Sequence, residues 1–129
     1  MIAVDTSVLI RYFVQDDFQQ AALATRLLEE RLTLSQPGVI TSIAIYEVSW
    51  VLQRIYKVDW NEVRSILIRL LGAPNLIVEH HDEVAKALAA STGFGDAMIH
   101  FVGRSLGCSL TMTLDKKFAR LEGVELLVE

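Results

Sequence analysis

Short apolar runs alternate with longer segments of helical periodicity along the whole chain. The runs that predict strands are residues 2–4, 39–40, 76–78, 110–114 and 124–128. Short apolar runs bounded by polar or glycine-containing segments are typical of buried strands. Strands that alternate with helices predict a parallel sheet covered on both faces. We therefore expect a three-layer α/β/α sandwich with a central, mainly parallel sheet.

The intervening segments predict helices. They cover residues 8–14, 17–32, 42–56, 59–71, 82–90, 96–106 and 116–121. Several follow an Asp, Thr or Ser, which are preferred N-cap residues. Gln36-Pro37-Gly38 and Gly93-Phe94-Gly95 are predicted to interrupt the helical pattern. Because no repeat or linker divides the chain, we expect residues 1–129 to form a single domain.

Composition narrows the class of protein. No stretch reaches the roughly 20 apolar residues of a membrane span, and the start MIAVD predicts no signal peptide. The single Cys108 excludes a disulfide framework and a multi-cysteine zinc site, which predicts a cytoplasmic protein. The net charge of −4 argues against a simple polyanion binder. An acidic metal site would also lower the charge, so nucleic acid stays open as a substrate.

Two acids directly follow predicted strands. Asp5 comes after residues 2–4 and Asp115 after residues 110–114. Ligands of parallel sheets bind beyond the carboxyl ends of the strands, so both positions suit a functional site. Either acid could instead cap a helix or turn.

Isolation from other charges selects two more acids. Of the 16 Asp and Glu residues, only Asp5, Glu47, Asp96 and the chain-terminal Glu129 have no charged residue within three positions. A buried carboxylate needs a compensating cation, and the neighbouring sequence offers none. All-carboxylate sites favour hard ions such as Mg²⁺ or Mn²⁺. The alternatives are a solvent-facing position for Glu47 and an N-cap for Asp96.

The segments 5–13 and 113–118, together with Glu47 and Asp96, resemble a PIN domain. They look most like the VapC-type ribonuclease toxins of bacterial VapBC toxin–antitoxin pairs, and the resemblance covers essentially the whole chain. It implies a Mg²⁺- or Mn²⁺-dependent endoribonuclease, a VapB-type antitoxin as partner and a homodimer. Two positions depart from the family pattern: Ser7 stands where Asn is frequent, and Gly93 where many members carry a further Asp.

The resemblance and the chemistry of phosphodiester cleavage suggest roles for the candidates. Asp5 and Asp96 are expected to bind metal directly, and Asp115 and Glu47 directly or through water. Residues expected to orient water or phosphate oxygens are Thr6, Ser7 and Thr113; residues expected to contact the RNA backbone are Arg11, Arg104, Lys116 and Lys117. Repulsion among converging carboxylates should raise the pKa of at least one of them.

Other classes of protein remain as alternatives. They are a non-catalytic PIN-type RNA-binding module, a receiver-like phosphoacceptor domain and a nuclease acting on DNA or 5′ flaps. The isolation of Asp5 argues against the receiver-like domain, which needs adjacent acids. The presence of all four acids argues against the non-catalytic module, and the short chain argues against a flap nuclease.

Overall fold

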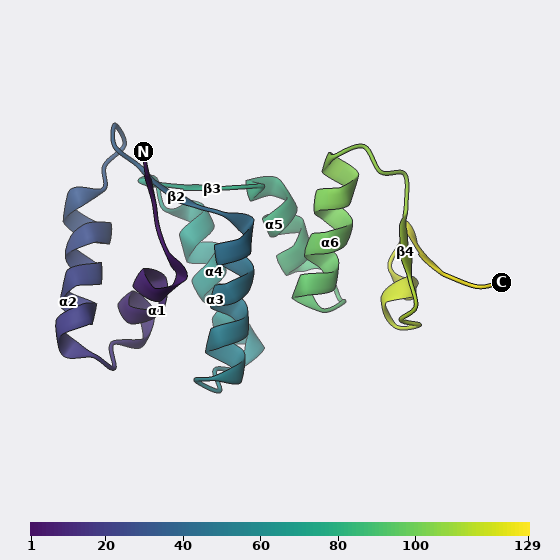
Figure 1. Ribbon diagram of the computed structural model, residues 1–129, viewed down its shortest axis with the longest axis horizontal. Helices are drawn as coiled ribbons and strands as arrows, with labels where there is room; N and C mark the ends of the chain where they lie inside the picture. Colours follow the sequence, from purple (N-terminus) through teal and green to yellow (C-terminus); the bar gives the residue numbers. More distant parts are fainter. The chain divides into compact units, whose positions relative to one another are not determined.

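A computed structural model describes residues 1–129 of the chain, which divide into two compact units, residues 1–79 and 80–129. The elements of the first unit are β1 (Ile2–Ala3), α1 (Thr6–Val14), α2 (Phe18–Arg26), the π-helical turn η1 (Leu27–Arg31), β2 (Gly38–Ile40), α3 (Ser42–Arg54), α4 (Trp60–Gly72) and β3 (Leu76–Val78). Those of the second are α5 (His81–Ala89), α6 (Phe94–Ser105), β4 (Thr111–Thr113), the 3₁₀ turn η2 (Phe118–Arg120) and β5 (Val124–Leu126) (Figure 1).

The first unit is built on a three-stranded parallel sheet in the order β1-β2-β3. Ile2 pairs with Gly38, which in turn pairs with Leu76. Helix α1 packs against α2 and α3, and α3 packs against α4. Because both strand pairs are parallel, the carboxyl ends of all three strands lie at the same edge of the sheet.

The helices of this unit start at local capping signals. The Asp17 carboxylate caps α2 by accepting from the Gln20 backbone N–H at 3.0 Å, and the Asp59 carboxylate caps α4 by accepting from that of Glu62 at 3.1 Å. Thr41 caps α3 through its hydroxyl. These contacts satisfy backbone donors that the first turn of a helix leaves without partners.

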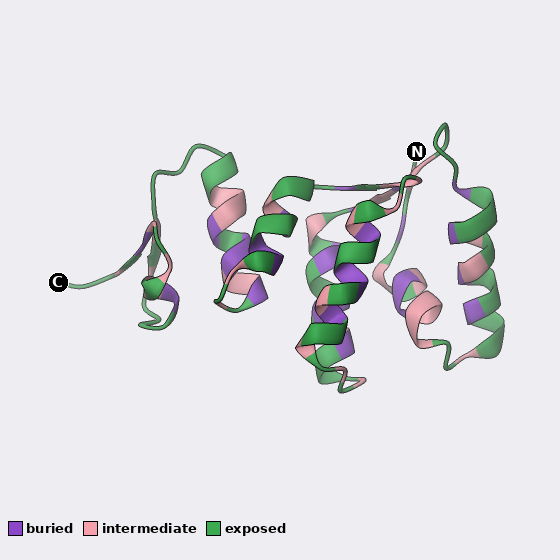
Figure 2. Cartoon of the chain, turned by 180° about the vertical axis from the view of Figure 1, so that it is seen from behind, coloured by how far each residue is buried: buried purple, intermediate pink, exposed green.

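The apolar stripes of these helices form the core. The largest fully buried side chains of the unit are Leu9, Ile40, Ile45, Val48, Leu52, Val63 and Leu67. Figure 2 shows buried residues as stripes along α3 and α4. Gly38 leaves room for the Leu32 side chain against β2, because a Cβ there would lie 2.6 Å from Leu32 Cδ1. Helices α1 and α3, which carry candidate residues, are therefore held in place by a packed core.

The second unit combines a helix pair with a two-stranded parallel sheet. Helix α5 packs against α6, and β4 pairs with β5 in the register Thr111 to Val124. His100 is buried on α6 and its Nδ1 lies 2.8 Å from the Thr111 hydroxyl, so α6 is linked to β4. Burial, followed by the charge of nearby Arg104, lowers the pKa of His100. The imidazole is therefore neutral near pH 7 and serves packing.

The expected fold class is confirmed: helices alternate with strands, and every strand pair is parallel. The strands form a sheet of three and a sheet of two. The predicted interruption at Gly93-Phe94-Gly95 is wrong in its second half, because α6 begins at Phe94. Phe94 is buried, so packing offsets the cost of Gly95 within the first turn. No helix has the length and hydropathy to cross a bilayer.

Candidate functional site

Asp5 lies directly after β1 and caps α1. Its Oδ2 accepts hydrogen bonds from the Ser7 hydroxyl at 2.5 Å and from the Ser7 backbone N–H at 3.2 Å. The hydroxyl bond, followed by the backbone bond, lowers the pKa of Asp5. The direction is opposite to the one expected from repulsion among carboxylates. A backbone hydrogen bond from Thr6 lowers the pKa further, so the exposed Asp5 is ionised at neutral pH.

Glu47 lies on the exposed side of α3, where it contacts the start of α1. Thr6 donates its hydroxyl hydrogen to Glu47 Oε1 at 3.0 Å. This bond joins residues 41 positions apart and holds the Glu47 side chain beside the residue that follows Asp5. Asp5 and Glu47 are thus linked to neighbouring residues of α1: Asp5 binds Ser7, and Glu47 binds Thr6.

Glu79 is an acid at the same edge that our selection by isolation missed. Its Oε1 accepts from the Ser42 backbone N–H at 2.9 Å and from the Ser42 hydroxyl at 2.8 Å. Asp82 lies three residues away, so Glu79 fails the test of isolation. The rule that picked out Asp5 and Asp115, an acid directly after a strand, would have found it.

The carboxyl edge of the first sheet therefore carries polar residues after each strand. Asp5 follows β1, Thr41 and Ser42 follow β2, and Glu79 follows β3. Asp5 and Glu79 each bind the N-terminal region of a helix, where the backbone N–H groups and the helix dipole favour negative charge. These hydrogen bonds hold the starts of α1 and α3 in place. Because Glu47 lies on α3, they also help to place Glu47.

Asp96 occupies the first turn of α6. It is the third residue of the helix and Gly93 is the N-cap, so the N-cap interpretation of Asp96 is wrong. The half-buried carboxylate has no hydrogen bond or ion pair. A Cβ at Gly93 would lie 3.7 Å from Asp96 Oδ2, in ordinary contact. An acid at position 93 would therefore stand beside Asp96, and in this chain the carboxylate is alone there.

Asp115 follows β4 and organises the turn into η2. Its Oδ1 accepts from the backbone N–H groups of Lys117 at 2.8 Å and Phe118 at 3.2 Å. The Thr113 hydroxyl accepts from the Asp115 backbone N–H at 3.0 Å. The carboxylate is exposed, and its Oδ2 takes part in no hydrogen bond. Asp115 therefore has the turn-capping role of the alternative interpretation while one oxygen stays available.

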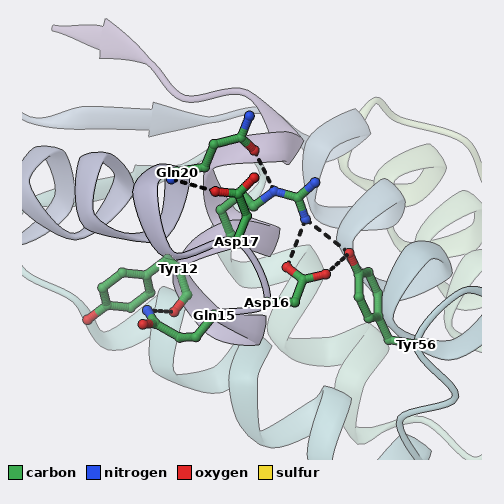
Figure 3. A network of polar contacts seen from close by, with 7 residues as sticks. Tyr12, Gln15, Asp16, Asp17, Gln20 and Tyr56 are labelled. Atoms are coloured by element: carbon green, nitrogen blue, oxygen red, sulfur yellow. Dashed lines mark hydrogen bonds and ion pairs between the residues drawn. The ribbon is translucent and has the colours of Figure 1, made fainter.

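The basic candidates differ in their surroundings. Arg11 lies in a polar network in which its Nε donates to Gln20 at 2.6 Å and its Nη1 contacts Asp16 and Tyr56, both at 3.0 Å (Figure 3). Most of its donors are thus used to tie α1 to α2 and to the chain after α3. Arg104, Lys116 and Lys117 are exposed and make no side-chain hydrogen bond or ion pair.

The donor chemistry of the four acids fits a hard divalent ion, although neither unit by itself gathers a metal-binding group. In neither unit do three or more Asp, Glu, His or Cys side chains converge on a point that could hold a metal ion. None of the four acids forms an ion pair with a basic side chain, and all four supply carboxylate oxygens. Oxygen ligands of this kind are the ones that Mg²⁺ and Mn²⁺ prefer.

Comparison with known proteins gives the family. No curated protein matches the chain significantly. The family model described as PIN domain matches residues 2–124, a range that includes all four acids. PIN domains are generally nucleases, which hydrolyse phosphodiester bonds, and typically use divalent metal ions. With nearly its whole length matched, the chain belongs to the PIN-domain family.

Proposed function

We propose that this protein is a metal-dependent endoribonuclease and the toxin of a type II toxin–antitoxin pair. The observation that carries the proposal is the PIN match over residues 2–124, because it spans four acids that lack a cationic side-chain partner. In this proposal residues 1–129 act as one domain in the cytoplasm. The protein forms a homodimer and is inhibited by a VapB-type antitoxin.

The proposed metal ligands are Asp5 and Asp96, with Asp115 and Glu47 binding directly or through water. A bound Mg²⁺ or Mn²⁺ would lower the pKa of a water molecule and neutralise charge on the phosphoryl oxygens. The carboxylates would hold the ion, so their ionised state is the functional one. The hydrogen bonds from Ser7 favour this state for Asp5 at neutral pH.

The neighbouring hydroxyls have orienting roles in this scheme. Thr6 donates to Glu47 and leaves one Glu47 oxygen for metal or water. The Ser7 hydroxyl donates to Oδ2 of Asp5, and the Thr113 hydroxyl accepts from the Asp115 backbone N–H. Each hydroxyl thereby restricts one acid to a single orientation, which reduces the reorganisation needed when substrate binds.

The alternatives are less well supported. Membership of the PIN family excludes the receiver-like phosphoacceptor. A non-catalytic PIN-type module would be expected to have lost some of the four acids, and all are present. The toxin role rests on the resemblance to VapC-type chains, with Ser7 and Gly93 as departures. Co-expression with the product of a neighbouring short reading frame should suppress cleavage if that frame encodes the antitoxin.

The test of the nuclease proposal is replacement of single acids. Asp5→Asn and Asp96→Asn should each reduce Mn²⁺-dependent cleavage of a structured RNA pool by roughly 10²–10³-fold or more, the scale of losing a key electrostatic group. Asn keeps the shape and an acceptor oxygen but removes the charge that binds metal.

Asp59→Asn is the matched control. Asp59 is also a helix N-cap of the first unit and accepts a backbone N–H, yet it is not a proposed ligand. It should leave cleavage unchanged. Full activity of Asp5→Asn or Asp96→Asn, in folded protein, would remove that acid from the proposed site.

A further inference from the structure

Two adjoining cavities of the second unit are lined by most of its basic side chains. The larger, of about 570 Å³, lies between α5, α6 and the chain before β5. The smaller, of about 340 Å³, lies between the chain before α6 and η2. Leu121 and Glu122 line both cavities, so the two share a wall. Volumes of this size are typical of sites for small-molecule groups such as a nucleotide.

The cations that line these cavities have no acidic partners. Of the five Lys and Arg residues in the unit, Lys86 and Arg104 line the larger cavity, and Lys117 and Arg120 the smaller. None of the four has a carboxylate within ion-pair distance. Arg104 Nη1 instead lies 3.2 Å from the place where a Cβ on Gly123 would stand, against the main chain. These charges are therefore available to an anion.

The smaller cavity is lined by the chain just before α6, and the larger one by the C-terminal half of α6. The smaller cavity includes Thr92, just before the helix, and Lys117, two residues after Asp115. The larger includes Arg104, eight residues beyond Asp96. At about 1.5 Å per residue, Arg104 lies about 12 Å further along the helix. The smaller cavity is thus lined by chain neighbours of Asp96 and Asp115, although neither acid lines a cavity itself.

We propose that the two cavities form one track that binds the backbone of single-stranded RNA and leads it to the end of the unit that carries Asp96 and Asp115. This inference rests on the proposed nuclease function. The lining of the two cavities contains four cationic side chains and two carboxylates. The lining is therefore positively charged, although the chain as a whole has a net charge of −4. The positive charge attracts phosphates, and the concave, nucleotide-sized shape suits separate nucleotides better than a duplex.

The other lining groups suit nucleobases. Phe101 lies on α6 at the larger cavity and is half-buried, so part of its ring can stack on a base. The Glu83 and Glu122 carboxylates can accept hydrogen bonds from base amino groups. A strand that presents both phosphates and amino groups matches this lining better than a simple anion does.

The test separates binding from cleavage by working in EDTA. Binding of a fluorescently labelled single-stranded RNA is followed by anisotropy over a range of salt concentrations. Arg104→Gln and Arg120→Gln should each weaken binding by roughly three- to tenfold, and each should reduce the slope of log affinity against log salt by about 0.7. Arg31→Gln removes the same charge from an exposed position of the first unit and should change neither quantity.

Three outcomes would overturn the track: equal RNA affinity in all variants, an equal effect of Arg31→Gln, or a preference for duplex RNA. Melting temperatures of the variants show that a loss of binding is not a loss of fold. The nuclease proposal fails separately, when Asp5→Asn keeps cleaving. If Arg104→Gln and Arg120→Gln bind RNA normally while Asp5→Asn is inactive, the track is wrong and the nuclease proposal stands.

Discussion

The Ser7 hydroxyl, two residues along the chain, stabilises the ionised form of Asp5. Ser7 donates to Asp5 Oδ2 through both its side chain and its backbone, and the carboxylate also caps α1. Hydrogen bonds to the ionised form of an acid lower its pKa. Serine and the amide of asparagine both supply donors, so Ser7 can orient the acid and stabilise its ionised form at a position where asparagine is frequent in the family.

Ser7→Ala should raise the pKa of Asp5 towards its ordinary value of 3.8, because it removes the largest cause of the lowering. In the wild type the folded pKa lies below the unfolded one. Its contribution to stability is therefore present above about pH 4 and is lost as the pH falls through the folded pKa. Carboxyl NMR titration in EDTA measures the pKa directly, and unfolding by urea at pH 7 and pH 3 should show a smaller acid-induced loss in Ser7→Ala. An unchanged titration of Asp5 would contradict the assignment.

At the scale of elements, the sequence predicted most starts of helices because caps are local. Asp17, Thr41 and Asp59 each bind a backbone N–H within three residues, so the signal and the contact lie in the same short segment. The start of α6 was misjudged because burial of Phe94, a tertiary effect, decided it. Glu79 was missed for a local reason: Asp82 lies three residues away, so the test of isolation discarded Glu79, although its position directly after a strand would have selected it.

Glu79→Ala should destabilise the start of α3 by about 1 kcal/mol, the typical effect of losing a helix cap with its favourable charge. The variant frees the Ser42 N–H and hydroxyl. Because α3 carries Glu47, cleavage should also fall, and Glu79→Gln, which keeps an acceptor, should recover part of both losses. Urea unfolding and cleavage rates measure the two effects. Glu30→Ala, at an exposed acid without a side-chain contact, should show neither.

Gly123→Ala should destabilise the protein more than Gly107→Ala. Both glycines have positive φ, +87° and +101°, and alanine in this conformation costs about 1–2 kcal/mol. A Cβ at Gly123 would also lie 2.9 Å from His100 Cε1, whereas nothing lies within 4 Å at Gly107. Overpacking of this kind adds about 1–3 kcal/mol. The difference between the two variants in urea unfolding should shrink in a His100→Ala background, and equal losses would exclude the collision.

At the scale of the whole molecule, alternation of strands and helices was enough to predict an α/β fold with parallel strands. Which strands share a sheet was beyond the sequence, because β1 has only two residues and pairing partners lie far apart in the chain. The same limit applies to the site. Sequence selects acids by neighbourhood, whereas the hydrogen bonds that orient Glu47 and Asp5 come from side chains whose placement depends on the fold.

If the protein acts as one domain, metal binding should stabilise both units against unfolding together. Asp5 and Glu47 belong to residues 1–79, and Asp96 and Asp115 to residues 80–129. An ion that binds only the folded chain stabilises it by mass action, by about 2.7 kcal/mol at a free concentration about 100-fold above Kd. Thermal unfolding of the wild type should therefore be a single transition that shifts upward with Mn²⁺.

The variants decide whether the acids of both units serve the same ion. Asp5→Asn and Asp96→Asn should each abolish the shift of the whole transition, although they lie in different units, and Asp59→Asn should keep it. If a variant loses the Mn²⁺-induced shift for only part of the unfolding transition, the two units unfold independently. In that case the ion is held within one unit and stabilises that unit alone. If Mn²⁺ shifts Asp5→Asn as much as the wild type, Asp5 does not bind the metal.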